Sequence, residues 1–263
     1  QSVAMVYDMV KDAGVLTDQD LERLDDTLRL FMESMERRAD SGSINNWNVA
    51  EAVGAFYCGL VMQDLSATER WFKGPSGICD QLRIGTMDDG WWYECAVSYN
   101  TWVASQFSQV AIAWQPWGVD FKNMTLPASY VKNVLLEPEL NGGLLPHTSD
   151  PAQLAKPFGM DPDVHGPLRK PSRKIKDLWD SMIPFIDWRG VMFGVNDSTE
   201  NSVVAQPDGL DPSPFELAYY LYRDPAYASV IKRGATRDLL YGVPELPEQT
   251  PANFRDSAVA DNA

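Results

Sequence analysis

Apolar residues recur at intervals of three and four through most of the chain, whereas strict apolar–polar alternation is almost absent. Residues 17–38 begin with a Thr/Asp pair and then place leucines and a phenylalanine on one face, which predicts an amphipathic helix. Residues 47–63 form a nearly continuous apolar run, too long for a strand, that predicts a buried helix. Further helices are expected from residue 67, after Ser66 as its cap, and over residues 78–84, 91–113, 172–186, 215–222 and 225–240. The pattern therefore predicts a mostly α-helical protein.

The central part of the chain differs from its flanks. Residues 114–170 are dense in Pro, Gly, Asn and Asp, with one helix-compatible stretch at 128–136. A segment of this kind connects elements over a surface and often carries binding residues. The sequence from Pro244 onward is rich in proline and acidic residues and predicts a frayed end. From periodicity alone, the helices fit a bundle, a solenoid or an (α/α) toroid.

Charge narrows the possible functions. The 263 residues include 37 acidic and 22 basic side chains, for a formal net charge of −15. This balance argues against sequence-independent binding of nucleic acid, which needs a basic surface. No apolar stretch reaches the roughly 18 residues that a membrane-spanning helix needs. The dense basic run comprises Arg169, Lys170, Arg173, Lys174 and Lys176, and it fits a solvated helix face better than a substrate channel.

Cysteine and histidine are scarce. The three cysteines, Cys58, Cys79 and Cys95, form no CxxC pair and lie in apolar stretches, which favours buried, unreactive thiols. The two histidines, His147 and His165, are too few for a multi-histidine metal site. These counts argue against zinc, thioredoxin-type and multi-histidine sites.

Several of the nine tryptophans fall at predicted junctions between loops and helices: Trp47, Trp91, Trp92, Trp114, Trp117 and Trp188. Sugar rings stack their C–H faces on aromatic side chains, so this distribution favours a sugar-binding cleft. The alternative is that these tryptophans fill the core, which is an equally good interpretation for any one of them but a poorer one for the set.

Two polar clusters accompany these aromatic residues. The first is Asn45-Asn46, directly before the predicted buried helix. An Asn at this place is by default a helix N-cap, and the functional alternative is an amide that donates hydrogen bonds to a carboxylate. The second cluster spans residues 88–100 and ends at Tyr99, which on a helix over residues 91–113 would share one face with Trp92. Tyr99 is either a core tyrosine with a hydroxyl partner or a side chain of a cleft.

Taken together, these clusters resemble the heparinase II/III-like polysaccharide lyases. The matching segments are Asn45-Asn46-Trp47 and Asp89-Gly90-Trp91-Trp92-Tyr93-Glu94 through Tyr99. Asn46 and Tyr99 stand 53 positions apart, close to the separation between the family's carboxylate-binding Asn and its catalytic Tyr. The later Trp188-Arg189-Gly190 through Asn196-Asp197-Ser198 is also similar to a loop of that family, and the resemblance covers roughly residues 42–246.

The resemblance implies a fold and a set of site residues. It implies an incomplete (α/α) toroid over residues 1–246, an extended acidic tail or linker over residues 247–263, and a C-terminal β-sandwich domain of the parent chain beyond them. In the family that β domain often holds a metal ion, so no metal ion or other cofactor is expected in this chain. Asn46 would bind the uronate carboxylate, with Asn45 as the second choice, and Tyr99 would be the general acid. The expected substrate-binding residues are Asn45, Trp47, Arg83, Trp91, Trp92, Glu94, Asn100, Trp117 and Arg189. Some relatives carry His where Asn46 stands, and neither histidine of this chain falls in a matching motif.

These residue types suit β-elimination, which removes the C5 proton of a uronate and expels the 4-linked sugar oxygen. An amide or an arginine stabilises the charge that develops on the carboxylate, a base takes the proton, and an acid protonates the leaving oxygen. The expected substrate is a 1,4-linked, uronate-containing anionic polysaccharide, first a sulfated one such as ulvan or a glycosaminoglycan and next alginate. An unperturbed tyrosine titrates near about 10, so Tyr99 would need Arg83, Arg189 or another cation beside it to act as base as well as acid. The sequence leaves the base unassigned.

Two other functions stay open. A glycoside hydrolase on the same toroid would use two of the carboxyl groups Asp88, Asp89 and Glu94, whereas a non-catalytic glycan-binding domain would use Trp91 or Trp92. The absence of GxGxxG, GxxxxGK[ST] and GxSxG motifs argues against dinucleotide, P-loop and serine-hydrolase functions. We expect a secreted or periplasmic protein without nucleic-acid or membrane partners. Since the chain starts at Gln1, a processed chain or an excised piece is expected.

Overall fold

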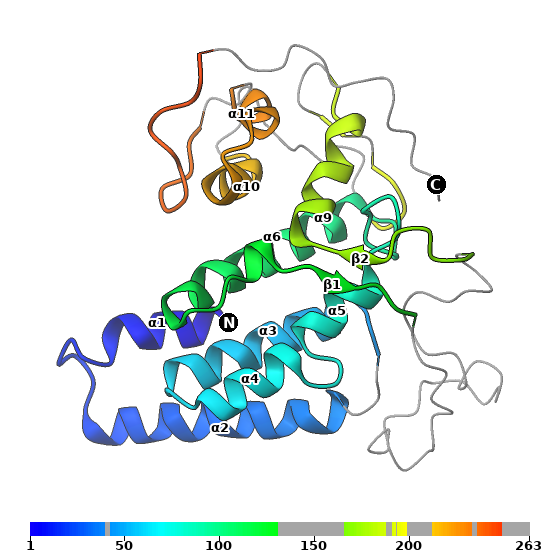
Figure 1. Cartoon of the computed structure of the whole chain (residues 1–263). Helices are drawn as coiled ribbons and strands as arrows, with labels where there is room; N and C mark the ends of the chain where they lie inside the picture. The colour runs from blue at the N-terminus through cyan, green and yellow to red at the C-terminus, as the bar shows by residue number, and fades with distance from the viewer. Residues whose placement is uncertain are drawn as a thin grey trace. The chain divides into compact units, whose positions relative to one another are not determined.

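The computed structural model describes residues 1–39, 43–130, 166–187, 191–192, 194–198, 212–232 and 236–248, and it is mostly helical (Figure 1). The chain divides into two compact units, which are described separately. The first unit comprises Gln1–Gly85 and Ser129–Gly166, and the second comprises Thr86–Ala128 and Pro167–Ala263. The expectation of a mostly α-helical protein is confirmed.

The first unit is built around a central buried helix. Its helices are α1 (Ser2–Val10), α2 (Asp18–Ala39), α3 (Asn46–Val61), α4 (Leu65–Lys73) and α5 (Ile78–Gly85), and the other four all contact α3 (Figure 1). The apolar run predicted to form a buried helix is α3, whose side chains from Ala52 to Gly59 are all buried. Helix α1 was not among the helices that the sequence pattern predicted.

A glycine allows α3 and α4 to approach closely. A Cβ at Gly59 would lie 2.8 Å from Oγ1 and 2.9 Å from the backbone nitrogen of Thr68, so no larger residue fits there without displacement. The N-cap of α4 is Asp64, whose side chain accepts a hydrogen bond from the Ala67 backbone N–H at 3.0 Å. The prediction that Ser66 caps this helix is therefore wrong, because α4 already begins at Leu65 and Ser66 lies within its first turn.

The second unit contains α-helices, short 3-10 helices (labelled η) and one two-stranded sheet. Its elements are α6 (Val97–Trp114), η1 (Gln115–Trp117), η2 (Phe121–Asn123), β1 (Leu126–Pro127), β2 (Ser172–Arg173), α9 (Ile175–Met182), η3 (Ile183–Phe185), α10 (Phe215–Tyr222) and α11 (Pro225–Ile231). Strands β1 and β2 are antiparallel, with Leu126 opposite Arg173. Helix α6 contacts α9 and α10, and α10 contacts α11 (Figure 1).

Aromatic side chains form the core between these helices. Trp179 of α9 is fully buried and donates its indole N–H to Ser108 Oγ of α6 at 3.0 Å. Its ring meets Phe215 of α10 with a centroid separation of 5.2 Å, and Phe215 in turn meets Tyr227 of α11 at 5.5 Å. Of the tryptophans at predicted junctions, Trp91, Trp92 and Trp114 are also buried, whereas Trp47 and Trp117 are exposed, so the core interpretation holds for the first three.

One predicted helix begins in the wrong place. The sequence pattern predicted a helix over residues 91–113, but α6 starts at Val97. Trp92 instead pairs with Thr86 in an isolated β-bridge, and the Met87 backbone N–H donates to Trp91 O at 2.8 Å. Residues 86–92 therefore form a tight turn, and Trp92 and Tyr99 do not share a helix face.

The predicted helix over residues 225–240 is also too long, because α11 ends at Ile231. Of the helix-compatible stretch at 128–136, residues 128–130 are not helical and the rest lies outside the described residues. Within the described ranges, no helix combines the length and apolar character needed to cross a lipid bilayer.

Candidate functional site

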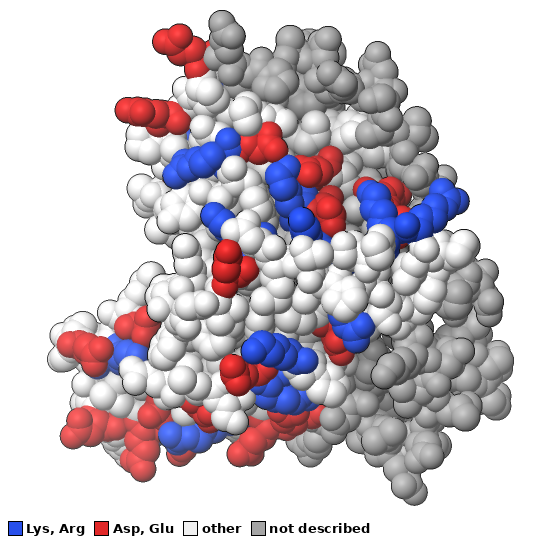
Figure 2. Space-filling model, in the orientation of Figure 1, with Lys and Arg blue, Asp and Glu red and all other residues white. Residues whose placement is uncertain are grey.

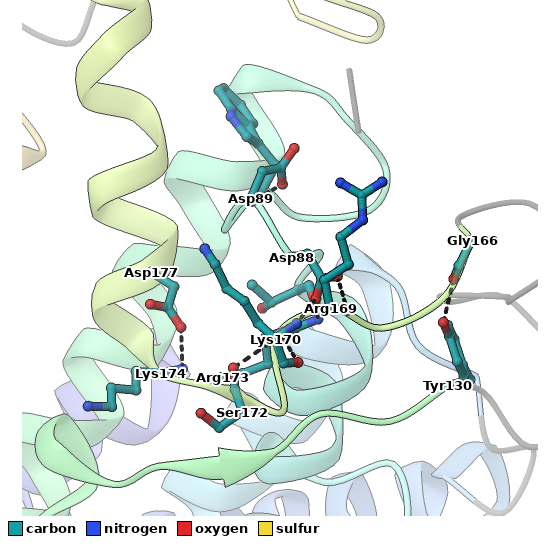
Figure 3. A network of polar contacts seen from close by, with 12 residues as sticks. Asp88, Asp89, Tyr130, Gly166, Arg169, Lys170, Ser172, Arg173, Lys174 and Asp177 are labelled. Atoms are coloured by element: carbon teal, nitrogen blue, oxygen red, sulfur yellow. Dashed lines mark hydrogen bonds and ion pairs between the residues drawn. The ribbon is translucent and has the colours of Figure 1, made fainter. Parts of the chain in front are cut away.

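A buried ion pair organises the start of the second unit. Arg173 and Asp88 have side chains only 1% and 7% exposed, and Nη2 of Arg173 lies 2.6 Å from Oδ1 of Asp88 (Figure 3). Asp88 also accepts the backbone N–H groups of Arg169 and Lys170, at 2.5 and 3.2 Å. Arg173 donates in addition to the backbone oxygens of Thr86, Lys170 and Ser172. The pair thus fastens the loop before β2 to the turn at residues 86–92.

These contacts keep Asp88 ionised. Burial alone would raise the pKa of Asp88, but the N–H groups of Arg169 and Lys170 and the guanidinium of Arg173 outweigh it and hold the pKa below its ordinary value. A glycosidase needs one carboxyl group with a raised pKa as its general acid. Asp88 is therefore poorly suited to that role.

Two residues of the basic run, Arg173 and Lys176, form ion pairs. Arg173 pairs with Asp88, and Nζ of Lys176 lies 2.7 Å from Asp180 and 2.8 Å from Asp224. Lysine and arginine side chains of this unit lie next to aspartate and glutamate side chains, while acidic side chains gather over α2 of the first unit (Figure 2). Arg173 and Lys176 thus have acidic partners that offset their charges.

Four residues expected to bind substrate are structural in this fold. Trp92 is fully buried, with its indole N–H donating to Glu94 Oε2 at 2.7 Å, and Trp91 is 8% exposed with its ring edge-to-face against Phe185. Asn100 is fully buried, accepts from the Trp92 backbone N–H at 2.8 Å and donates to Leu178 O at 3.1 Å. The expectation that Trp91, Trp92 and Asn100 face a cleft is therefore wrong, because each is enclosed by its own unit. Glu94 is half-buried and serves Trp92 as acceptor.

Tyr99, in contrast, lies in a polar cluster at the surface end of α6. Its hydroxyl donates to Oδ2 of Asp197 at 2.8 Å. The Ser98 backbone N–H donates to Ser198 Oγ at 2.9 Å, and Asn196 Nδ2 donates to Cys95 O at 3.0 Å. Helix α6 has no side-chain cap from its own N-cap residue, so Ser198 supplies one from a distant part of the chain.

Asp197 and its neighbours were not among the predicted site residues. Asn196-Asp197-Ser198 had been noted only as part of a family-like loop, and nothing in periodicity places it beside α6. Trp102 was also missed. It is 37% exposed and lies one helical turn from Tyr99, and residues three apart on a helix are surface neighbours.

In the first unit, the two asparagines at the start of α3 have different positions in the helix. Asn45 is the N-cap, and its side-chain oxygen accepts the Asn48 backbone N–H at 2.9 Å. This agrees with the default interpretation of Asn45 and leaves Asn46, the first residue of α3, as the better candidate for a carboxylate ligand. Trp47 follows it with 72% of its surface exposed, so its ring is open for stacking.

The remaining predicted residues are distributed between the two units. Arg83, in the last turn of α5, pairs with Asp80 at 2.7 Å, and Trp117 in the second unit is 44% exposed. Arg189 lies outside the described residues, as do Trp188 and both histidines. Arg83 therefore belongs to the first unit, whereas Tyr99 belongs to the second.

Asp89 is a further carboxyl group of the turn. Its Oδ1 accepts the Trp91 backbone N–H at 3.0 Å, and its Oδ2 is buried without a hydrogen-bond partner among the described residues.

Among the described residues there is no group of three or more His, Cys, Asp or Glu side chains that could hold a metal ion. Burial raises the pKa of the Cys58 and Cys95 thiols and raises that of Cys79 to about 12, which disfavours reactive thiolates.

No protein-family model matches the chain, and a comparison with curated proteins finds no match.

Proposed function

We propose that the protein is a polysaccharide lyase that cleaves a 1,4-linked, uronate-containing anionic polysaccharide by β-elimination, on an (α/α) toroid, in a secreted or periplasmic setting. The proposal rests on the resemblance to the heparinase II/III-like lyases together with one structural observation. That observation is the placement of the Tyr99 hydroxyl in a surface cluster of polar side chains, held at 2.8 Å by Asp197.

Tyr99 has the properties that a general acid in this reaction needs. Its hydroxyl is the donor in the bond to Asp197, so it carries the proton that the leaving oxygen requires. It sits in the first turn of an eighteen-residue helix whose inner face is packed, so the side chain is mounted on a rigid element. Trp102, one turn along α6, offers an exposed ring on which a sugar can stack.

Asn46 and Trp47 support the proposal in the first unit. With Asn45 engaged as the cap of α3, Asn46 is the amide that we assign to the uronate carboxylate, and the exposed Trp47 is a stacking surface next to it. An amide donor fixed at the start of a helix stabilises the developing charge of the enolate because it needs little reorganisation.

The hydrolase alternative is less well supported. Asp88 is buried, ionised and bonded to Arg173 and the loop backbone, and Glu94 accepts from the Trp92 indole. A carboxylate held ionised in this way lacks the proton that glycosidic bond cleavage requires. A sulfated polymer such as ulvan or a glycosaminoglycan is our first choice of substrate, followed by alginate.

The test is the ultraviolet absorbance of the C4=C5 double bond that β-elimination creates next to the uronate carboxylate. The full-length protein would be incubated with ulvan, chondroitin, heparan, hyaluronan and alginate. We expect absorbance to rise with one polymer and Tyr99→Phe to lower kcat by about 10²–10⁴-fold, the usual contribution of a general acid. Tyr220→Phe is the matched control, since Tyr220 is also exposed on a helix of the second unit and its loss should change nothing.

The other outcomes refute either the lyase or the role of Tyr99 in it. New reducing ends without the absorbance would establish hydrolysis. Retention on a polymer with neither product would establish a glycan-binding domain, and equal activity of Tyr99→Phe and wild type would remove Tyr99 from the mechanism.

A further inference from the structure

The segment of residues 194–198 is fastened onto the first turn of α6. Ser198 Oγ accepts the Ser98 backbone N–H at 2.9 Å and lies 3.1 Å from Ser98 Oγ, which also contacts Asp197 O at 3.4 Å. Asn196 donates to Cys95 O at 3.0 Å. These contacts join residues about a hundred positions apart, and together they aim the Asp197 carboxylate at the Tyr99 hydroxyl.

The direction of the Tyr99–Asp197 bond has a chemical consequence. Because the phenol donates its proton to Asp197, the lone pairs of the phenol oxygen point away from the carboxylate. A phenol in this state can accept a proton on one side only if it passes its own proton to the carboxylate on the other. The geometry is that of a two-step proton relay.

On the basis of the proposed lyase function, we propose that Asp197 is the terminal proton acceptor of the reaction, acting through Tyr99. The C5–H bond breaks, its proton moves to Oη of Tyr99, and the phenolic proton moves to Oδ2 of Asp197. The electron pair of the C5–H bond stays on the uronate as an enolate. That pair then forms the C4=C5 bond as the C4–O bond breaks.

The relay runs backward to complete the reaction. The leaving oxygen takes the proton from Tyr99 while Asp197 returns its proton to the phenol. The net change is transfer of one proton from C5 to the leaving oxygen, with no oxidant, reductant or further reactant, and Tyr99 and Asp197 end in their starting states. Asp197 supplies the base that the sequence left unassigned.

A carboxylate can accept the C5 proton when the resulting enolate is stabilised. Carboxylate bases remove protons next to a carbonyl group when preorganised donors stabilise the enolate. Asp197 is exposed, so it is not shielded from a substrate that binds over the start of α6.

Two substitutions of Asp197 separate proton transfer from orientation. Asp197→Asn keeps an oxygen that accepts the Tyr99 hydrogen bond but cannot take a proton, whereas Asp197→Ala loses both properties. The relay predicts that both variants of the full-length protein lower kcat by about 100-fold or more, within the range of general base catalysis, with KM changed by less than about threefold. Added formate should restore part of the activity of Asp197→Ala, because it returns a carboxylate to the vacated space.

Asp120→Asn is the matched control, because Asp120 is an exposed aspartate of the same unit whose carboxylate accepts a hydrogen bond from the side chain of Asn123 at 2.8 Å. We expect this variant to keep kcat within about threefold of wild type. A purely structural role of Asp197 would instead leave Asp197→Asn, which keeps the hydrogen-bond acceptor, as active as wild type, and would leave Asp197→Ala without a response to formate.

The outcomes distinguish the relay from the lyase itself. If wild type forms the unsaturated product, Tyr99→Phe does not, and Asp197→Asn stays within a few-fold of wild type, the relay is overturned and the lyase stands. If wild type forms no unsaturated product on any polymer, the lyase is overturned and the relay with it.

Discussion

Replacing Asp88 by Asn should destabilise the protein far more than the loss of one surface charge. The substitution leaves the Arg173 guanidinium, 1% exposed, without the carboxylate that lies 2.6 Å from it. Breaking a buried pair by removing one partner costs about 3–5 kcal/mol of unfolding free energy, because the remaining charge stays desolvated. For a chain of this size, that is a decrease in Tm of about 6–20 °C.

Urea denaturation and thermal unfolding at neutral pH measure this difference. Asp26→Asn is the matched control: Asp26 pairs with Arg29 at 3.4 Å, but their side chains are 73% and 55% exposed. We expect this control to lose at most about 0.5 kcal/mol, as exposed ion pairs do.

Acidification adds a second check, with a definite sign. The pKa of Asp88 is lowered in the folded protein, so its stabilising contribution is complete above the ordinary carboxyl pKa and is lost as the pH falls through the folded pKa. The gap between wild type and Asp88→Asn should therefore narrow below about pH 4. A loss of less than about 1 kcal/mol at neutral pH, or a loss equal to that of Asp26→Asn, would refute the reasoning.

Three further substitutions test other parts of the structure. Gly90→Ala should cost about 2 kcal/mol or more in urea denaturation, since φ is +91° and the new Cβ would clash with the backbone oxygen of Asp177. Gly118→Ala, at φ +84° in open space, should cost only about 1 kcal/mol, and equal costs for the two variants would contradict the clash at Gly90. Trp102→Ala should raise KM for the polysaccharide about tenfold at constant kcat, and an unchanged KM would exclude stacking there. Arg237→Ala leaves Glu216, 1% exposed, without its partner and should cost about 3 kcal/mol, whereas a loss below about 1 kcal/mol would show that the pair is dispensable.

Helices with a clear start signal and a single apolar face could be predicted from the sequence. Helix α2 and helix α10 lie within a residue of the expected ranges, and Asn45 caps α3 as expected. These features depend on neighbours within a few residues, so local spacing is enough to identify them.

Residues 91–96 show where local spacing fails. Their apolar and aromatic residues continue the pattern of α6, but Trp92 is held in a turn by Thr86 and by the side chain of Asn100. These interactions come from residues six and eight positions away, but they are a β-bridge and a side-chain hydrogen bond, which the spacing of apolar residues does not report. Asn100 also donates to Leu178 O, 78 positions along the chain, and this long-range contact was not predictable from the local pattern that led us to expect Asn100 at a cleft.

The candidate site was likewise predictable only in part. Tyr99 could be singled out because it follows a recognisable Asp-Gly-Trp-Trp stretch, whereas Asp197 could not be assigned a role. Its contact with Tyr99 spans 98 positions and depends on a loop without periodicity. No signal in a single sequence reports such a pairing.

The cap that Ser198 provides for α6 also sets an order of events during synthesis. Helix α6 leaves the ribosome about a hundred residues before the serine that satisfies the Ser98 N–H. Domains form as their segments emerge, so the end of α6 that carries Tyr99 gains its cap only after residues 194–198 have been translated. A nascent or prematurely terminated chain that lacks residues 194–198 therefore contains Tyr99 without its hydrogen bond to Asp197.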